Sequence, residues 1–185
     1  MELEEIIIII GVIAVIVWAV KANSKKDGKW DDSAVDKERI LEALDNYSLT
    51  KRKYNKFKSV RQAEVAWNKD LEEHFSKKFL HVRQGSASKA VEIDLDIGRG
   101  KYGIELKWAD KISTKTPSRN TIGQIKDYYK NGHYEKLLLV VAGTAEHKHN
   151  NFLSDIKEDI KKDYACDYYY MEITKNMPTS KTEAS

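Results

Sequence analysis

A run of apolar residues near the N-terminus most constrains how this 185-residue chain can fold. Ile6 to Val20 contains no charged residue and includes five consecutive isoleucines, whereas the rest of the chain is strongly polar. As a helix the run would extend about 22 Å, which is short of the ~30 Å hydrocarbon layer unless Leu3, Ala22 and a snorkelling Lys21 lengthen it. Because the run is apolar on every side and lies at a terminus, it is not typical of a buried helix in a soluble core. We therefore expect residues 1–22 to form a single-pass membrane anchor.

The charges beside the anchor predict its orientation. Only glutamates precede the run, whereas four lysines follow it within residues 21–29. By the positive-inside rule this places the C-terminal body in the cytoplasm, and a single cysteine, Cys166, agrees with a reducing compartment. A cleaved signal peptide is the main alternative, because its apolar region has this length, but the preceding residues are acidic and no clean A-x-A site follows.

The composition of the remaining chain is that of a globular domain with appendages. Hydrophobic residues make up 41% of the sequence, and there are only two prolines. The single cysteine excludes a disulfide scaffold. The net charge of +3 permits an acidic partner without requiring one. We divide the chain into the anchor, a linker and basic amphipathic segment (23–58), a folded domain (59–173) and a disordered tail (174–185).

The segment before the folded domain contains a short helix and a basic stretch. Residues 33–47 have the spacing of a short amphipathic helix that begins at a capping pattern opened by Ser33. Between Lys51 and Arg61 lie six basic residues and no acid, with Tyr54 and Phe57 among them. This stretch could contact phosphates of nucleic acid or of anionic lipid, or it could be a solvated helix face.

A longer helix is predicted from Ser59 to about Phe79. Its apolar residues form one stripe, and Glu64 lies inside that stripe. A carboxylate on the core side of a helix is costly unless something compensates its charge. Glu64 is therefore either a partner in a structural ion pair, the commoner explanation, or a side chain that faces a polar site.

After this helix the periodicity changes to that of strands alternating with helices. Strands are predicted at 79–83, 90–97, 102–108, 136–142 and 167–173, and helices at 121–131 and 150–163. The run from Leu137 to Val141 is apolar without alternation, which is typical of a parallel strand covered on both faces. The expected fold class is α/β, with a mixed β-sheet sandwiched by helices.

The second and third strands form a hairpin with one polar face. Asp94 and Asp96 project from one strand and Glu105 and Lys107 from the next, so the four groups could form one cluster. Carboxylates are the hard oxygen ligands that Mg²⁺ and Mn²⁺ prefer, and a lysine beside them could act on a water. The alternative is an amphipathic hairpin whose charged face is simply exposed to solvent.

These residues also resemble a known family pattern. I93-D94 followed by I104-E105-L106-K107 is similar to the D…(D/E)-x-K core of the PD-(D/E)XK nuclease superfamily, and Q124-I-K-D-Y128 matches the Q-x-x-x-Y element of its RecB-like branch. The similarity covers roughly residues 59–142, and the order of helices and strands is that of the superfamily core. The resemblance implies a restriction-endonuclease-like fold and metal-dependent phosphodiester hydrolysis.

The resemblance also implies a set of metal ligands. Asp94 and Glu105 would ligate Mg²⁺ or Mn²⁺, and Glu64 would add a ligand from the preceding helix. The sequence departs from the family pattern in two ways: no proline precedes Asp94, and Asp96 competes with Asp94 for the ligand role.

Other residues take their expected roles from the same resemblance. Lys107 would act on the attacking water, and Gln124 with Tyr128 would hold the substrate or the catalytic groups in place. The predicted loop 111–120 would contact flanking phosphates, unless it is an ordinary surface loop, through three basic residues: Lys111, Lys115 and Arg119.

The expected protein is thus a membrane-anchored nuclease that acts on nucleic acid, with DNA as the expected substrate and a homodimer as one possible assembly. The alternative is a catalytically inactive nuclease-fold module that binds nucleic acid or scaffolds a membrane complex. In a third interpretation the motif set is a coincidence on an exposed hairpin. This interpretation predicts neither cleavage nor binding of nucleic acid.

Overall fold

The computed structural model describes residues 25–49, 60–85, 93–131 and 134–173. The predicted anchor at 1–22, most of the basic stretch and the tail from residue 174 lie outside the described residues. None of the described helices is long and apolar enough to cross a bilayer.

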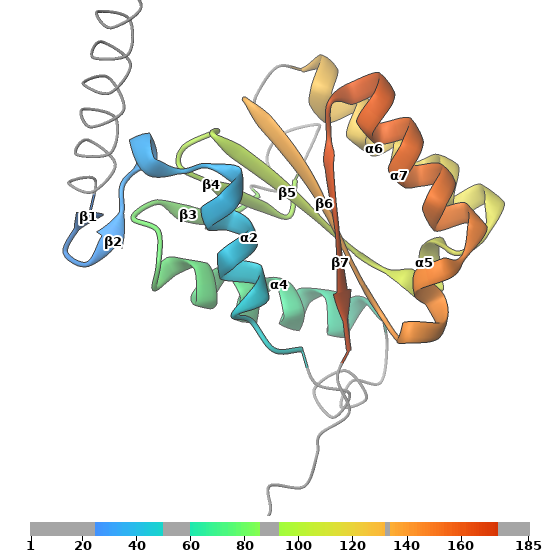
Figure 1. The fold of residues 1–185 in the computed structure, drawn as a ribbon, viewed down its shortest axis with the longest axis horizontal. Helices are drawn as coiled ribbons and strands as arrows, with labels where there is room; N and C mark the ends of the chain where they lie inside the picture. Colours follow the sequence, from blue (N-terminus) through green and yellow to red (C-terminus); the bar gives the residue numbers. More distant parts are fainter. Residues whose placement is uncertain (1–24, 50–59, 86–92, 132–133, 174–185) are drawn as a thin grey trace, which may run out of the picture.

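A mixed five-stranded sheet forms the centre of the fold (Figure 1). The strands lie side by side in their order along the chain: β3 (Val82–Gln84), β4 (Leu95–Ile97), β5 (Tyr102–Trp108), β6 (Lys136–Gly143) and β7 (Asp167–Glu172). The three strands β3, β4 and β5 pair antiparallel, whereas β6 pairs parallel with both β5 and β7. The helices between the parallel strands are the crossovers that this pairing requires.

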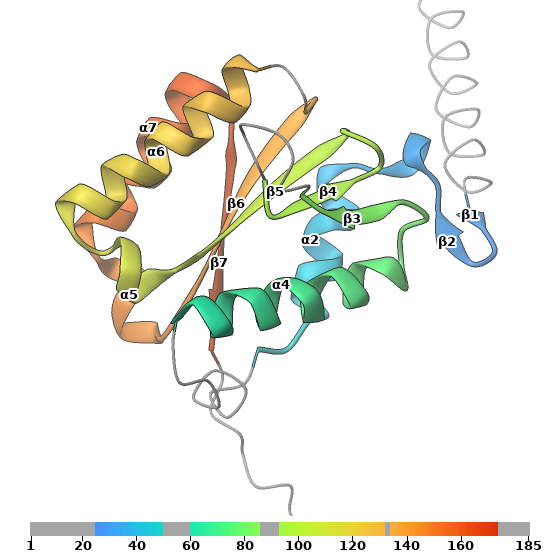
Figure 2. The ribbon, with the colours of Figure 1, turned by 180° about the vertical axis from the view of Figure 1, so that it is seen from behind.

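Helices cover both faces of the sheet, as Figures 1 and 2 show. One face carries α2 (Lys37–Asp45) and α4 (Val60–Ser76), and the other carries α5 (Ala109–Ile112), α6 (Lys115–Lys130) and α7 (Asn151–Tyr164). The predicted α/β architecture, a mixed sheet sandwiched by helices, is therefore confirmed.

Strand β6 is buried on both faces, which explains its unbroken apolar sequence. Leu138 and Val140 belong to the core beneath α2 and α4, whereas Leu139 and Val141 belong to the core beneath α6 and α7. Because successive side chains of a strand point to opposite faces, a strand between two helical layers needs apolar residues at every position.

The segment before α4 packs onto the same sheet. Trp30, in the short hairpin of β1 (Lys25–Lys26) and β2 (Lys29–Trp30), exchanges backbone hydrogen bonds with Lys78 and Leu80. The 3-10 helix η1 (Asp32–Ala34) follows, and α2 contributes apolar side chains to the core that α4 also fills: Ile40, Ala43 and Leu44. The N-cap of α2 is Asp36, not the predicted Ser33, and its carboxylate accepts from the Arg39 N–H.

Several predicted boundaries need correction. Strand β4 is shorter than the predicted 90–97, because Asp94 lies in a bend before it, and residues 86–92 are outside the described chain. The predicted loop 111–120 is wrong: Lys111 is in α5, and α6 begins at Lys115. Pro117 is the third residue of α6, where proline is tolerated because first-turn N–H groups have no partner within the helix.

Candidate active site

Strand β5 places Glu105 and Lys107 on one face. Its other side chains, including Ile104 and Leu106, lie in the core beneath α4. Glu105 is only 2% exposed, and both of its oxygens are hydrogen-bonded. Oε1 accepts from Nζ of Lys107, and Oε2 accepts from the hydroxyl of Tyr128 at 3.0 Å. The carboxylate is thus held between its own strand and α6.

The polar face of the hairpin is not exposed to solvent, so that alternative is wrong. Asp96 and Glu105 are each 2% exposed. The sequence alternates as in a half-exposed hairpin, but Tyr128 of α6 packs against Glu105, and Arg83 of β3 pairs with Asp96. Buried carboxylates are retained only where hydrogen bonds or opposite charges compensate them, and both residues have such partners.

Asp94 lies where β4 and β5 stop pairing. The two strands pair only as far as Leu95 and Ile104, so beyond this point β5 has β6 on one side and no β4 residue on the other. The carboxylate of Asp94 takes the place of a strand partner, because its Oδ2 accepts from the backbone N–H of Leu106 at 2.7 Å. This bond fixes Asp94 beside the segment that carries Glu105 and Lys107.

Asp96 has a different environment from Asp94. Its Oδ2 accepts from two nitrogens of Arg83, at 2.8 and 2.6 Å, and its Oδ1 accepts from the backbone N–H of Gly100 at 2.7 Å. Asp96 therefore closes the turn between β4 and β5 and joins it to β3. The structure places Asp94, and not Asp96, with Glu105 and Lys107.

The proximity of these charges shifts their pKa values. Burial, together with the neighbouring Asp94 carboxylate, raises the pKa of Glu105 to about 7. Burial alone would lower the pKa of Lys107, but the carboxylates around it, Glu105 above all, outweigh burial and raise it. At neutral pH Lys107 is therefore protonated, and it is the cation that pairs with Glu105.

Glu64 reaches the same region from the other helical layer. The ring centroids of Trp67 and Trp108 lie 4.5 Å apart, and this contact holds the middle of α4 against the end of β5. Glu64 is half-buried, and burial raises its pKa; Lys107 opposes this shift and Asp94 adds to it. The polar surroundings expected for Glu64 are therefore present, and they include the Lys107 ammonium group.

The predicted residues of α6 differ in their positions. Tyr128 is buried, and its bond to Glu105 raises the tyrosine pKa beyond the effect of burial. Gln124 lies one helical turn earlier on the same side of α6 and is exposed. The basic residues Lys115 and Arg119 are also exposed, on the first turns of α6, and Lys111 is exposed on α5.

Sequence reasoning missed Asn68. It lies one turn after Glu64 on α4, and its Nδ2 donates to Oδ1 of Asp94 at 3.3 Å. Its own Oδ1 is buried without a hydrogen-bond partner. The available signal was the four-residue spacing from Glu64, which puts both polar side chains on one side of the helix.

The donor set has the chemistry that a hard divalent cation prefers. Asp94 and Glu105 supply carboxylate oxygens whose mutual repulsion a cation would relieve. Among the described residues, no three His, Cys, Asp or Glu side chains come close enough together to hold a metal ion. The described site thus offers a carboxylate pair, with Glu64 as a further oxygen donor in its electrostatic surroundings.

Comparisons with known proteins identify no relative of this chain. No protein-family model, curated protein sequence or solved structure matches this chain.

Proposed function

We propose that this protein is a membrane-anchored, metal-dependent nuclease of the restriction-endonuclease-like fold that hydrolyses phosphodiester bonds in DNA. The observation that carries the proposal is the meeting of Asp94, Glu105 and Lys107 where β4 and β5 diverge. These three residues form what we call the catalytic cluster. Two carboxylates and a lysine held together at the diverging end of a mixed sheet are suited to hydrolysis of an anionic ester.

The carboxylates of the catalytic cluster are the proposed metal ligands. Asp94 and Glu105 would hold Mg²⁺ or Mn²⁺, with Glu64 as an additional ligand. The cation would supply the positive charge that offsets charge developing on the scissile phosphate. In the chain itself, the Leu106 N–H and Asn68 orient Asp94, and Tyr128 orients Glu105.

The protonation of Lys107 indicates what this side chain contributes. A raised pKa keeps the ammonium form at neutral pH, so Lys107 is suited to donate a hydrogen bond rather than to remove a proton. Its bond to Glu105 holds Nζ beside the carboxylate pair. We infer that Lys107 positions the attacking water or an oxygen of the phosphate.

Exposed residues around the cluster are the proposed substrate contacts. Gln124 lies on the Tyr128 side of α6, and three basic side chains stand at the start of α6 and on α5: Lys111, Lys115 and Arg119. Basic side chains that contact phosphates position a nucleic acid without reading its sequence. The anchor at 1–22 would keep this domain at the cytoplasmic face of a membrane.

A cleavage assay tests the proposal. Full-length protein in nonionic detergent is incubated with double-stranded DNA, single-stranded DNA and RNA in the presence of Mg²⁺, Mn²⁺ or EDTA. We expect metal-dependent cleavage of DNA, and we expect Lys107→Ala to reduce it by at least about 100-fold. Lys157→Ala, which removes an exposed lysine of α7, is the matched control and should cleave as the wild type does.

One result would revise the proposed mechanism, and another would contradict the nuclease. Full cleavage by Lys107→Ala would remove Lys107 from the mechanism. Binding of nucleic acid without cleavage under any metal condition would instead favour the inactive nuclease-fold module.

A further inference from the structure

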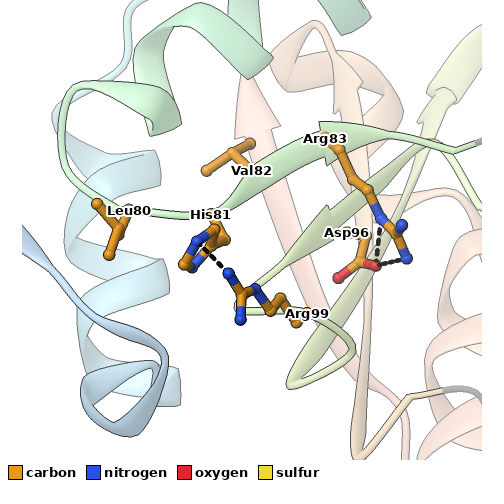
Figure 3. A pocket seen from close by; sticks show the side chains of 6 residues that line it. All are labelled: Leu80, His81, Val82, Arg83, Asp96 and Arg99. Carbon is orange, nitrogen blue, oxygen red and sulfur yellow. Dashed lines mark hydrogen bonds and ion pairs between the residues drawn. The ribbon is translucent and has the colours of Figure 1, made fainter.

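A second polar site lies on the β3 side of the hairpin and shares no residue with the catalytic cluster. A cavity of about 440 Å³, which we call the arginine pocket, is lined by residues of the β3 region, of β4 and of the turn after β4: Leu80, His81, Val82, Arg83, Asp96 and Arg99. Figure 3 shows Arg83 extending to Asp96 and Arg99 extending to His81. Neither arginine belongs to the catalytic cluster or to the proposed substrate contacts on α5 and α6.

Each arginine side chain is held in place by hydrogen bonds to a neighbouring residue. Arg83 is fixed by its two contacts with Asp96, which is almost fully buried. Arg99 donates to Nε2 of His81 at 2.7 Å, and Nδ1 of His81 lies 2.9 Å from Oδ1 of Asp32. Because arginine can only donate, Nε2 of His81 is the acceptor, and its Nδ1–H donates to Asp32. These two successive hydrogen bonds, from Asp32 to His81 and from His81 to Arg99, thus orient the Arg99 guanidinium.

Both guanidinium groups nevertheless face outward. The side chains of Arg83 and Arg99 are 71% and 70% exposed, whereas that of Asp96 is 2% exposed. A guanidinium has five N–H donors, so each retains donors beyond those that its carboxylate or imidazole partner uses. The buried Asp96 therefore lies behind Arg83, whereas Asp32 is 27% exposed and its Oδ2 lies 3.6 Å from Nε of Arg99. The surface presents two oriented guanidinium groups, with one partly exposed carboxylate beside Arg99.

The turn that carries Arg99 has an unusual backbone. Gly98, Arg99 and Gly100 all have positive φ, at 70°, 57° and 93°. Glycine adopts this region without cost, but for an arginine it costs about 1 kcal/mol. The turn therefore presents the Arg99 side chain at a position where glycine would fit the backbone better.

The arginine pocket is close to the catalytic cluster along the same hairpin. Arg83 lies opposite Asp96 in the pairing of β3 with β4, and Asp96 is two residues after Asp94. Because Asp94 lies in the bend before β4, its Cα is at most about 7 Å from that of Asp96. A ligand that occupies the catalytic cluster could therefore continue along the hairpin to the arginines.

We propose that Arg83 and Arg99 form a phosphate-binding subsite that holds the nucleic-acid backbone beside the catalytic cluster. Guanidinium groups match the oxygens of a phosphate in geometry as well as charge, and groups held in advance lose less side-chain entropy when they bind. This inference rests on the proposed nucleic-acid substrate and adds where its flanking backbone lies.

Two variants remove the arginines with little expected change to the fold. Arg99→Gly deletes the guanidinium and suits the positive φ of residue 99. The double variant Arg83→Gln with Asp96→Asn replaces the charged pair by a neutral one that can still hydrogen-bond and can still accept from the Gly100 N–H. Lys37→Gln, which removes one positive charge from an exposed ion pair with Asp167, is the charge-matched control for Arg99→Gly. The double variant leaves the net charge of the protein unchanged.

The test measures binding of a short fluorescein-labelled DNA duplex to the full-length protein by fluorescence anisotropy. EDTA prevents metal-dependent cleavage, and the salt concentration is varied. Each arginine variant should bind severalfold more weakly than the wild type. The slope of log affinity against log salt should become shallower by about 0.9 for each phosphate that the variant no longer neutralises. The Lys37→Gln control should keep the wild-type slope.

The possible results separate this inference from the proposed nuclease. Wild-type affinity and slope in both arginine variants would overturn the phosphate subsite and leave the cleavage assay to decide the nuclease. Weakened binding in the variants of a protein that never cleaves DNA would support the subsite and contradict the nuclease. A wild-type protein that binds no nucleic acid would overturn both.

Discussion

Tyr128 donates its hydroxyl hydrogen to Oε2 of Glu105 across 3.0 Å, and this bond joins α6 to the central strand β5. The other oxygen of the same carboxylate accepts from Lys107. Glu105 is therefore held from two sides in a buried position. A residue that binds a metal or substrate in one orientation needs such support.

Removing this bond should show how much the orientation of Glu105 matters while its charge is kept. Tyr128→Phe leaves the aromatic ring in the core but withdraws a donor from the Glu105 carboxylate, so we expect unfolding free energy to fall by about 1 kcal/mol. Cleavage should fall as well, because Glu105 is less well oriented. Tyr129→Phe, on an exposed neighbour, should change both quantities little. Urea unfolding and the cleavage rate of the two variants measure the difference, and equal cleavage by Tyr128→Phe and wild type would contradict a positioning role.

The two aspartates of the hairpin should give opposite results. Asp94→Asn retains an oxygen that can accept from the Leu106 N–H, so it should fold but lose metal binding and cleavage. Asp96→Asn loses the ion pair with the exposed Arg83, so it should lower stability by about 1 kcal/mol and spare metal binding. Calorimetric titration with Mn²⁺ and urea unfolding of both variants test this. A reversed ranking in metal binding would move the ligand role to Asp96.

Glu64 should contribute to metal binding more than to folding. Glu64→Gln keeps the size of the side chain and removes the charge, so metal affinity should fall at least about tenfold. The unfolding free energy should change by less than about 1 kcal/mol, because the side chain is only half-buried. Glu73→Gln, on an exposed position of the same helix, is the control. Intact metal-dependent cleavage with a lower thermal midpoint would make Glu64 a structural residue.

The buried Glu105 should make stability depend on pH in the absence of metal. Because the pKa of Glu105 is raised from 4.5 to about 7, the folded state binds this proton more tightly than the unfolded state does. The stabilisation that comes from binding this proton is fully present below pH 4.5 and is lost as the pH rises through 7. Glu105→Gln lacks this proton, so its stability relative to the wild type should increase between pH 5 and pH 8, by an amount on the order of 2 kcal/mol.

Urea unfolding in EDTA at both pH values measures this difference. Three groups titrate or carry charge beside Glu105 and share in the effect: Asp94, Lys107 and Tyr128. Glu158→Gln, which removes an exposed carboxylate of α7, should show no such trend. A constant difference between wild type and Glu105→Gln across this range would show that Glu105 is ionised throughout.

The anchor is tested by fractionation. Because residues 6–20 carry no charge, full-length protein should remain with membranes after carbonate extraction, and a variant without residues 1–22 should be soluble. A protease added to the outer side of the sealed membrane should not cut the C-terminal domain if that domain is cytoplasmic. Recovery of a secreted form that begins near Asn23 would show that the run is a signal peptide.

The sequence alone determined the elements whose periodicity is local. Strand β5 was predicted with its observed bounds, and β6 and α7 were predicted within one residue at each end. The alternation of β5 also put Glu105 and Lys107 on one face before any contact was known. Such features depend on neighbours within a few residues, so the pattern of side chains along the chain is sufficient to identify them.

The tertiary structure decided which surfaces are buried and which charges meet. An alternating hairpin looks the same whether its polar face meets water or a helix, and only the packing of α6 shows that Glu105 is buried. The separate roles of Asp94 and Asp96 likewise depend on Asn68 and Arg83, which lie far from them along the chain. The helical start of α6 was missed because Thr116, Pro117 and Ser118 favour a loop locally. Burial and electrostatics depend on residues brought together by the fold, and for that reason sequence periodicity could propose the catalytic cluster but could not show its environment.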